Sequence, residues 1–385
     1  MNAEPRLFTR AFTVLMLAHA LQSLGFASLL LMPLFLDHLG ASRAEVGVIL
    51  ATSAVGGLAV RPLVGWALDR VGRLPTLAVG TAFLAGGLGS VAFVDDLGGL
   101  VYLAHACLGI GTGSLFTGYF TLAADLVPPS RRTEGLALFG IAGLVTLTVN
   151  PLADALGIEG PALRGFFVVM GGLVVVSGLL LTLLPRDVTT SAAPRGAALP
   201  SLGALHRRPL WSVWWATLVF STLVAVFMAF ATVTAQDRGV DDPATVWLSY
   251  AAGAVTVRAF GARLPERIGP SRMVVPALLA YVVGTLGAAG AASTLGFGVA
   301  GLFAGIGHGF AFPVLTGQVV SRVEGELRGS AMALFTALWD LTKLGLVPVA
   351  GLLADVAGDG PMLFTFAMAG AASLLVWRRL ERLAR

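Results

Sequence analysis

The sequence predicts an all-α membrane protein with twelve transmembrane helices in two pseudo-symmetric bundles of six. Of its 385 residues, 56% are hydrophobic and only 12% are charged, against about 25% charged in ordinary soluble domains. The mean hydropathy is +0.86. The apolar residues also fall into long blocks, and roughly 20 apolar residues suffice to span a bilayer as a helix. Lipid is therefore the solvent expected for most of the chain.

Apolar runs between polar breaks define the expected spans. In the first half they are 11–36, 45–68, 74–94, 98–124, 134–156 and 162–184, and in the second half 210–235, 244–264, 273–294, 297–320, 329–354 and 361–378. The stretch between the halves is rich in Pro, Ser, Thr and Arg, a composition typical of an exposed linker. The expected domains are thus a bundle over 1–184, a cytoplasmic linker over 185–209 and a bundle over 210–385.

The arginines predict the orientation, because basic residues near helix ends are retained on the cytoplasmic side. They gather in alternate connections, and the opposite connections hold only Arg43, Arg164 and Arg238 along with many acidic residues. The first apolar block is too long for the core of a signal peptide. We therefore expect a multi-pass membrane protein with both termini in the cytoplasm.

The two halves share a loop motif. The segment 61–73 aligns with 258–270 at an offset of 197 residues, and arginine, acid, arginine and glycine recur in register. Internal repeats of helical bundles are typical of secondary transporters. The residues expected to form the gating motif are Arg61, Gly65, Asp69, Arg70, Gly72 and Arg73, with Arg258, Glu266 and Arg267 in the second half. The alternative is an arginine cluster that only sets topology.

The motif Gly65-x-x-x-Asp69-Arg70-x-Gly72-Arg73 resembles the signature loop of the major facilitator superfamily (MFS), and the resemblance extends over essentially the whole chain. Within that superfamily the sequence is most similar to bacterial permeases of the sugar-efflux and drug-efflux-like group. The resemblance implies a location in the bacterial inner membrane, and alternating access of two six-helix bundles about a central site in a working monomer. It also implies that Asp69 contacts the start of helix eleven, near Ser330, when the cytoplasmic side is closed.

Helix eleven contains the only lysine of the chain, Lys343, near its centre. Ionisable residues inside a membrane are costly and are functional candidates by default. Asp340 stands three residues earlier, on the same helical face. Lys343 is a candidate ligand for an anionic group of the substrate, and Asp340 is a candidate for proton exchange. The alternative is an ion pair that orients helix eleven against helix two.

Other candidates are histidines, an amide and aromatic rings within the spans. His19 and Gln22 share one face of the first span, and His105 occupies a position where many relatives carry an arginine. The expected substrate-binding residues are His19, Gln22, Phe26, Tyr119, Phe230, His308, Phe310 and Lys343, and the expected proton-coupling residues are Asp340, His19 and His105. Each histidine has the alternative of a purely structural hydrogen bond. Converging aromatic rings would suit an amphipathic organic molecule better than a sugar, whose hydroxyls need many polar partners.

Several other classes are excluded by what the sequence lacks. It has one cysteine, Cys107, and its arginines are dispersed between apolar blocks, so we expect no metal site, no cofactor and no nucleic-acid partner. The expected partners are a small-molecule substrate, protons and the lipid bilayer. The sequence thus predicts a non-enzymatic secondary transporter that exports a small amphipathic solute in exchange for protons. Two alternatives remain: a proton-coupled importer of an organic anion, and a non-transporting membrane sensor with the same fold.

Overall fold

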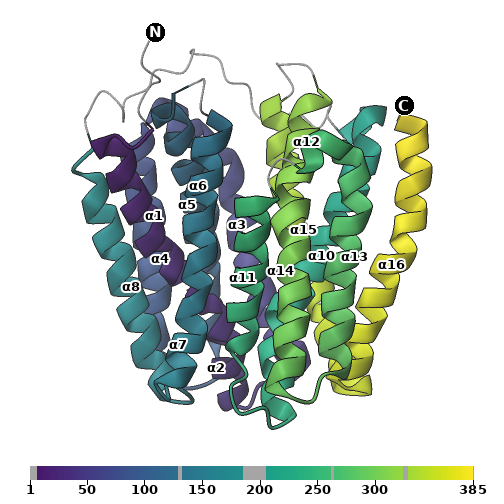
Figure 1. The fold of residues 1–385 in the computed structure, drawn as a ribbon. Coiled ribbons are helices and arrows are strands. Elements are labelled where there is room, and N and C mark those ends of the chain that lie inside the picture. The colour runs from purple at the N-terminus through teal and green to yellow at the C-terminus, as the bar shows by residue number, and fades with distance from the viewer. Residues whose placement is uncertain (1–6, 129–131, 185–204, 262–263, 324–327, 385) are drawn as a thin grey trace. The chain divides into compact units, whose positions relative to one another are not determined.

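A computed structural model describes residues 7–128, 132–184, 205–261, 264–323 and 328–384 (Figure 1). Most of the expected linker, 185–204, therefore lies outside the described residues. The described part is helical and contains no strand. Eleven of its helices are long and apolar enough to cross a membrane. The eighth expected span, 244–264, corresponds to the helix Thr245–Phe260, whose 16 residues are fewer than the roughly 20 of a typical span.

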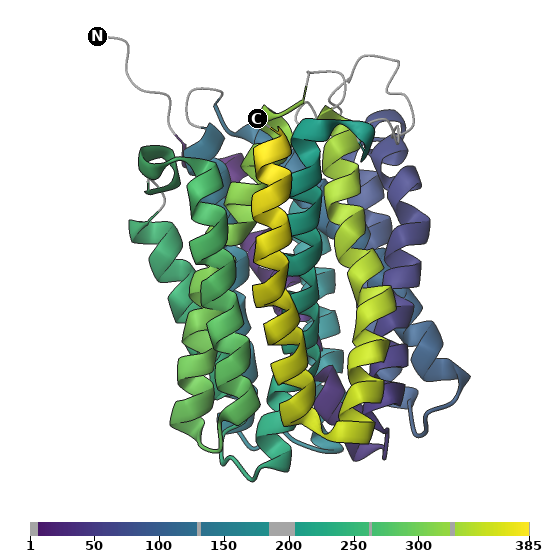
Figure 2. The ribbon, with the colours of Figure 1, turned by 90° about the vertical axis from the view of Figure 1, so that its right-hand side faces the viewer.

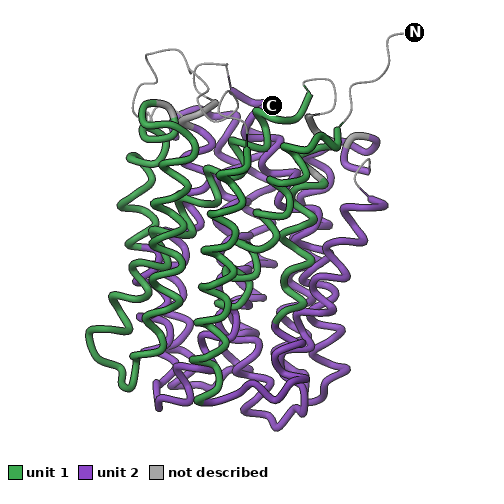
Figure 3. Tube along the Cα trace, turned by 90° about the vertical axis from the view of Figure 1, so that its left-hand side faces the viewer, with its two compact units in different colours: residues 1–29, 55–149, 161–198 green, residues 30–54, 150–160, 199–385 purple. Residues whose placement is uncertain are grey.

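The helices divide into two compact units, which Figure 3 distinguishes by colour. The first unit comprises residues 1–29, 55–149 and 161–198. Its helices are α1 (Arg10–Ser28), the second part of α3 (Arg43–Arg70), α4 (Arg73–Ser90), η2 (Val91–Phe93), α5 (Gly99–Leu126), α6 (Arg132–Val145), η4 (Thr146–Thr148) and α8 (Ala162–Leu181). Within it α4 packs against α5 and α8, and α1 packs against α8.

The second unit comprises residues 30–54, 150–160 and 199–385. Its helices are α2 (Met32–His38), the first part of α3, most of α7 (Val149–Ala155), α10 (Arg208–Asp237), α11 (Thr245–Phe260), α12 (Leu264–Ile268), α13 (Pro270–Gly290), α14 (Thr294–Ser321), α15 (Arg328–Ala357) and α16 (Asp359–Ala384), and η1 (Leu29–Leu31) lies at its boundary. Here α14 packs against α11 and α13, while α16 runs along α10 (Figure 2).

The internal repeat is visible in the backbone. The pairs α4–α5, α1–α8 and α4–α8 of the first half have counterparts in α13–α14, α10–α16 and α13–α16 of the second. Gly72 and Gly269, separated by the offset of 197 residues, are the N-caps of α4 and α13 and have φ of 112° and 96°. This backbone region favours glycine. The repeated motif therefore builds the same turn twice.

Two expected spans contain a short 3-10 turn near a proline, and each still forms one candidate membrane span, Arg10–His38 and Leu138–Ala155. The span expected over 11–36 is divided into α1, η1 and α2, and Pro33 lies in the first turn of α2. The span expected over 134–156 is divided into α6, η4 and α7, which contains Pro151. Proline lacks an N–H and clashes with the preceding helical turn. The helix ends beyond these turns belong to the second unit, so the division at residues 184 and 210 stays a prediction.

Candidate functional site

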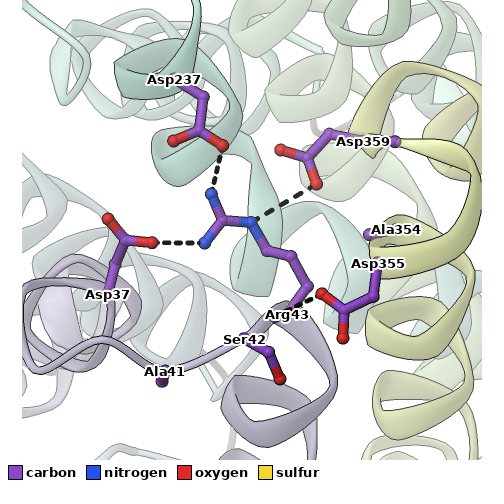
Figure 4. Close-up of a pocket in the computed structure, with 9 residues that line it drawn as sticks. Asp37, Ala41, Ser42, Arg43, Asp237, Ala354, Asp355 and Asp359 are labelled. Carbon is purple, nitrogen blue, oxygen red and sulfur yellow. Dashed lines mark hydrogen bonds and ion pairs between the residues drawn. The ribbon is translucent and has the colours of Figure 1, made fainter.

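The guanidinium of Arg43, at the start of α3, is surrounded by carboxylates of the second unit (Figure 4). Arg43 Nη1 lies 2.6 Å from Asp37 Oδ1, Nη2 pairs with Asp237 at the end of α10, and Nε lies 3.5 Å from Asp359 Oδ1 at the start of α16. These residues, with Asp355, line a pocket of about 370 Å³. We call Arg43, Asp37, Asp237, Asp355 and Asp359 the Arg43 cluster. It joins five helices, α2, α3, α10, α15 and α16.

Asp355 caps α3 although it belongs to α15. Its Oδ1 accepts from Arg43 N at 2.7 Å, and its Oδ2 accepts from Ala44 N at 2.8 Å. The first N–H groups of a helix have no partner within the helix, and a negative charge there is favoured by the helix dipole. Ser42 and Glu45 add a reciprocal capping box at 3.2 and 2.8 Å. The start of α3 is therefore fixed both locally and by α15.

A second aspartate caps a second helix in the same way. Asp154, in α7, accepts a hydrogen bond from Ala244 N, the N-cap of α11, at 3.1 Å. Ala244 has no side-chain oxygen that could do this itself. Both aspartates stand in a Leu-Ala-Asp-x-x-Gly sequence, 152–157 and 353–358, whose glycines have φ of 66° and 90°. We call Asp154 and Asp355 the aspartate caps; this repeat was a usable signal that sequence reasoning missed.

Glycines bring α3 and α15 into backbone contact beside the Arg43 cluster. A Cβ on Gly47 would lie 2.8 Å from Val347 O and 2.8 Å from the Pro348 Cα. A Cβ on Gly351 would overlap the Arg43 carbonyl oxygen. Small residues allow helix backbones to approach closely inside membranes. We call the pair Gly47 and Gly351 the glycine contact, and it fixes the spacing of α3 and α15.

Arg43, Arg164 and Arg238 are the arginines of the connections expected on the external side, and each forms an ion pair or hydrogen bonds with neighbouring residues. Arg43 lies in its cluster, and Arg164 Nη1 pairs with Asp95 Oδ1 at 2.9 Å within the first unit. Arg238 donates to the Ala288 and Ala289 carbonyls at 3.0 and 2.9 Å. These three positive charges therefore have specific structural partners.

Lys343 lies on α15 and connects it to α3. Its Nζ donates to Ser53 Oγ at 2.6 Å, and Ser53 Oγ donates to the Leu50 carbonyl at 2.8 Å. Asp340, one turn earlier on α15, acts on the lysine through its charge. The lysine thus has a hydroxyl partner on helix two in addition to the carboxylate that the sequence indicated.

His19 lies within a ring cluster of the first unit. Its ring stacks on Phe139 with centroids 4.0 Å apart, and it is 5.5 Å from the Tyr119 ring. Its Nδ1 is 3.5 Å from Ser23 Oγ. Gln22 is also buried, one turn along α1. The histidine and the amide therefore lie close together, as their spacing predicted, in tightly packed surroundings.

The remaining candidates of the first unit have different environments. Tyr119 is fully buried, and its hydroxyl bonds Ser177 Oγ, which donates to the Ala18 carbonyl at 2.7 Å. His105 is buried with Nδ1 2.8 Å from the Val101 carbonyl. Phe26 is 50% exposed. The structure thus brings Tyr119 to His19 and leaves Phe26 and His105 in other surroundings.

His308 lies at the centre of an aromatic cluster in the second unit. Its Nδ1 is 2.6 Å from Tyr250 OH, and its ring lies 5.3 Å from Phe220, 6.1 Å from Phe312 and 6.2 Å from Trp339. Tyr250, Phe220, Phe312 and Trp339 were not among the expected site residues. We call these five residues the His308 cluster.

Two expected aromatic residues lie apart from the contacts of His308. Phe230 is fully buried in α10, and the Phe310 ring packs beside Gly261 after the end of α11. Their predicted contact with substrate stays a prediction.

The gating motif is partly described. Arg73 is buried and donates through Nε to Asp125 Oδ2 at 3.2 Å and through Nη1 to the Leu68 carbonyl at 2.9 Å. Arg61 is half-buried in α3, Arg70 and Arg267 are exposed, and Gly65 has open space around it. The side chains of Asp69, Glu266 and Ser330 lie outside the described residues. Their predicted latch therefore stays a prediction.

At the repeat offset, Asp125 of the first half corresponds to Arg322 of the second. Arg322 Nη2 pairs with Glu381 Oε1 at 2.9 Å and donates to Ser271 Oγ at 2.9 Å. Ser212 Oγ donates to Glu381 Oε2 at 2.7 Å. Each half thus has an ion pair between its helix ends. In the first half the residue at this position is the acidic partner, Asp125, and in the second half it is the basic partner, Arg322.

Arg322→Ala is expected to destabilise the protein, because the Glu381 side chain is only 9% exposed and would lose its counter-charge. Removing one partner of a buried pair costs about 3–5 kcal/mol. The measurement is the melting temperature of the purified protein followed by tryptophan fluorescence, and a drop of several degrees is expected. The exposed Arg379 supplies the control variant Arg379→Ala. Additive losses in Arg322→Ala, Glu381→Gln and the double variant would contradict a specific pair.

Comparison with known proteins supports the fold and identifies the family. The family model of the Major Facilitator Superfamily matches residues 14–344. An uncharacterized MFS-type transporter of Salmonella typhimurium is 26% identical over 359 residues, covering 90% of this chain and 89% of the relative. The multidrug resistance protein MdtL of Klebsiella pneumoniae is 24% identical over 321 residues, with coverage of 80% and 81%.

The fold is also similar to that of solved transporters. A crystal structure of the nucleoside transporter NupG has a TM-score of 0.79 at 14% identity and covers 96% of this chain and 100% of its own. At this identity the likeness concerns the fold alone. Because the family model extends over most of the sequence, the chain belongs to the Major Facilitator Superfamily.

Proposed function

We propose that this transporter exports a small amphipathic organic solute across the bacterial inner membrane, in exchange for protons and as a monomer. The observation that carries the proposal is the His308 cluster, where one polar pair, His308 and Tyr250, lies among aromatic rings. Sites for organic ligands combine apolar and aromatic walls with a few placed polar groups. The similarity to a multidrug resistance protein supports the same solute class.

The orientation predicted from the arginines places both termini in the cytoplasm and the Arg43 cluster at the external face. There the Arg43 cluster, the aspartate caps and the glycine contact hold α3 against α15 and α7 against α11. This arrangement supports a state closed toward the outside. Opening would separate these helix ends and expose the capped N–H groups to water. Water can then replace the carboxylates as hydrogen-bond partner, so the closure is reversible.

Proton coupling is assigned to Asp340, His19 and His105. His19 and His105 are buried in the first unit, and Asp340 is half-buried in α15. A protonation change at any of them alters a charge inside the spans, which costs free energy unless a partner compensates. Substrate and proton could therefore favour different conformations of the same helices.

Everted membrane vesicles test the direction and the coupling. Respiration acidifies the vesicle lumen, and quenching of acridine orange fluorescence reports that acidity. Ethidium and salicylate serve as amphipathic probes of opposite charge. Export in exchange for protons is expected to restore fluorescence when a probe is added, in proportion to the amount of transporter. Equal responses in vesicles with and without the protein would contradict the proposal.

An importer of an organic anion is the second candidate, and Lys343 favours it, because a lysine within a span can bind an anionic group. Cotransport of proton and anion from the cytoplasmic face into the lumen would deepen the quenching when salicylate is added. A non-transporting sensor would bind a probe saturably and change neither signal. The sign of the fluorescence change therefore separates the candidates.

A further inference from the structure

Arg258 lies in α11 and is half-buried. It stands two residues before the helix end at Phe260, and helical side chains tilt toward the N-terminus of their helix. The side chain is therefore directed back along α11 rather than past its end. Its Cζ lies 5.9 Å from the centroid of the Phe312 ring. The sequence placed Arg258 in the repeated gating motif, at a position inside the expected span 244–264, and the structure places it in α11 beside the His308 cluster.

The guanidinium of Arg258 has unused hydrogen-bonding capacity. Its Nε is buried without a hydrogen-bond partner among the described residues, and no carboxylate in that part of the chain forms an ion pair with it. A guanidinium carries five N–H donors and no acceptor. Buried donors are nearly always satisfied in native proteins, and an exception calls for an explanation.

A second unused donor lies near the same ring. The indole Nε1 of Trp339, on α15, is buried without a hydrogen-bond partner among the residues that the structure describes. The Trp339 and Phe312 ring centroids are 5.9 Å apart. Phe312 is thus a common neighbour of Arg258 and Trp339. The region therefore offers two unsatisfied N–H donors, and one of them belongs to a cation. The ligand group that matches them accepts hydrogen bonds, donates none and carries a negative charge.

The surroundings specify the rest of the ligand. The Phe312 and Phe220 rings lie 5.9 and 5.2 Å from Trp339, so a planar aromatic body would find faces and edges to pack against. Lys343 stands four residues after Trp339, on the same face of α15, but its ammonium already donates to Ser53. That bond uses one of the three N–H donors of the ammonium. Arg258 is a second cation of this region, and its buried Nε has no hydrogen-bond partner among the described residues.

We propose that Arg258 and Trp339 bind the anionic group of an aromatic organic acid, whose ring packs against Phe312 and Phe220. This inference rests on the proposed function, since it names the substrate class of the transporter. The guanidinium supplies charge and two or more N–H donors, and the indole supplies one. Arg258 thereby acts as a specificity residue rather than as part of a gate.

The binding test uses the purified full-length protein in nanodiscs with 1-naphthoate as probe and 1-naphthalenemethanol as its neutral analogue. Arg258→Gln removes the charge, Arg258→Lys keeps it, and Trp339→Phe keeps a ring while removing the N–H donor. The exposed Arg272 of α13 provides the control variant Arg272→Gln. Isothermal titration measures affinity, and size-exclusion profiles and melting temperatures show whether each variant is folded.

Naphthoate affinity is expected to fall at least tenfold in Arg258→Gln and about threefold to tenfold in Trp339→Phe, since a hydrogen bond to a charged group is stronger than a neutral one. Arg258→Lys should retain part of the affinity, and Arg272→Gln all of it. Binding of the neutral analogue should not change. Unaltered naphthoate binding in both Arg258 variants, or no naphthoate binding by the wild type, would overturn the inference.

The same variants separate this inference from the proposed function. If adding ethidium still releases protons from the vesicles while naphthoate does not bind, the proposed proton-coupled export is supported and the assignment of an aromatic organic acid fails. If naphthoate binds through Arg258 and no probe moves protons, the site stands and proton-coupled export fails.

Discussion

Gly351→Leu is expected to abolish transport, with flux reduced at least tenfold at equal expression. A side chain at this position overlaps the carbonyl oxygen of Arg43, so α15 could no longer approach the start of α3. Both Asp355 hydrogen bonds to α3 would lengthen with the separation, and the closed arrangement would lose its caps as well as its packing. Flux in everted vesicles measures the loss.

Accessibility of α3 distinguishes a shifted conformation from an unfolded protein. Leu50 is buried in α3, so Leu50→Cys in a Cys107→Ser background reports exposure to a membrane-impermeant maleimide added to intact cells. Labelling is expected to rise several-fold when Gly351→Leu is combined with it. Gly345 of the same helix has open space around it and supplies the matched control Gly345→Leu, which should label and transport like the parent. Unchanged labelling and flux in Gly351→Leu would refute the role of the glycine contact.

The helices were predictable because lipid selects long apolar blocks, and the turn at Gly72 and Gly269 was predictable because its motif is repeated. The 3-10 turns near Pro33 and Pro151 could not be predicted from hydropathy, because the helical segments on both sides of each turn are apolar and lie within one candidate span. Arg258 was expected inside the span 244–264, and α11 carries it within the helix. Its position beside Phe312 could not be predicted, because that contact depends on how α11 and α14 pack.

The contacts of the Arg43 cluster could not be read from the sequence. Asp355 lies 312 positions from Arg43, and Asp237 lies 194 positions away. No local periodicity encodes such partners; they depend on how α3, α10 and α15 pack. The matching roles of the aspartate caps were easier to predict, because Asp154 and Asp355 stand in the same repeated local sequence. A repeat in the sequence indicates matching roles in the two halves, whereas the helix that each aspartate caps comes only from the three-dimensional arrangement.

Lys343→Met is expected to reduce flux at least tenfold across the pH range, while Ser53→Ala reduces it by no more than about threefold. Methionine approximates the length of lysine and removes the charge and the donors. Ser53→Ala removes only the hydroxyl that receives Nζ in the described state. If the charge of Lys343 takes part in substrate binding or proton transfer, removing the ammonium lowers flux far more than removing the Ser53 hydroxyl. Flux of each probe in everted vesicles from pH 6 to pH 8 measures the difference.

Asp340→Asn completes the comparison, because Asp340 acts on the lysine through its charge. An aspartate that exchanges protons should make transport depend on pH, and its removal should flatten that dependence while leaving naphthoate binding intact. A merely structural lysine has a different signature. Lys343→Met and Ser53→Ala would then lower the melting temperature by similar amounts and leave flux near that of the wild type, because both remove the same link between α15 and α3. That outcome would reduce Lys343 to an anchor that orients helix eleven against helix two.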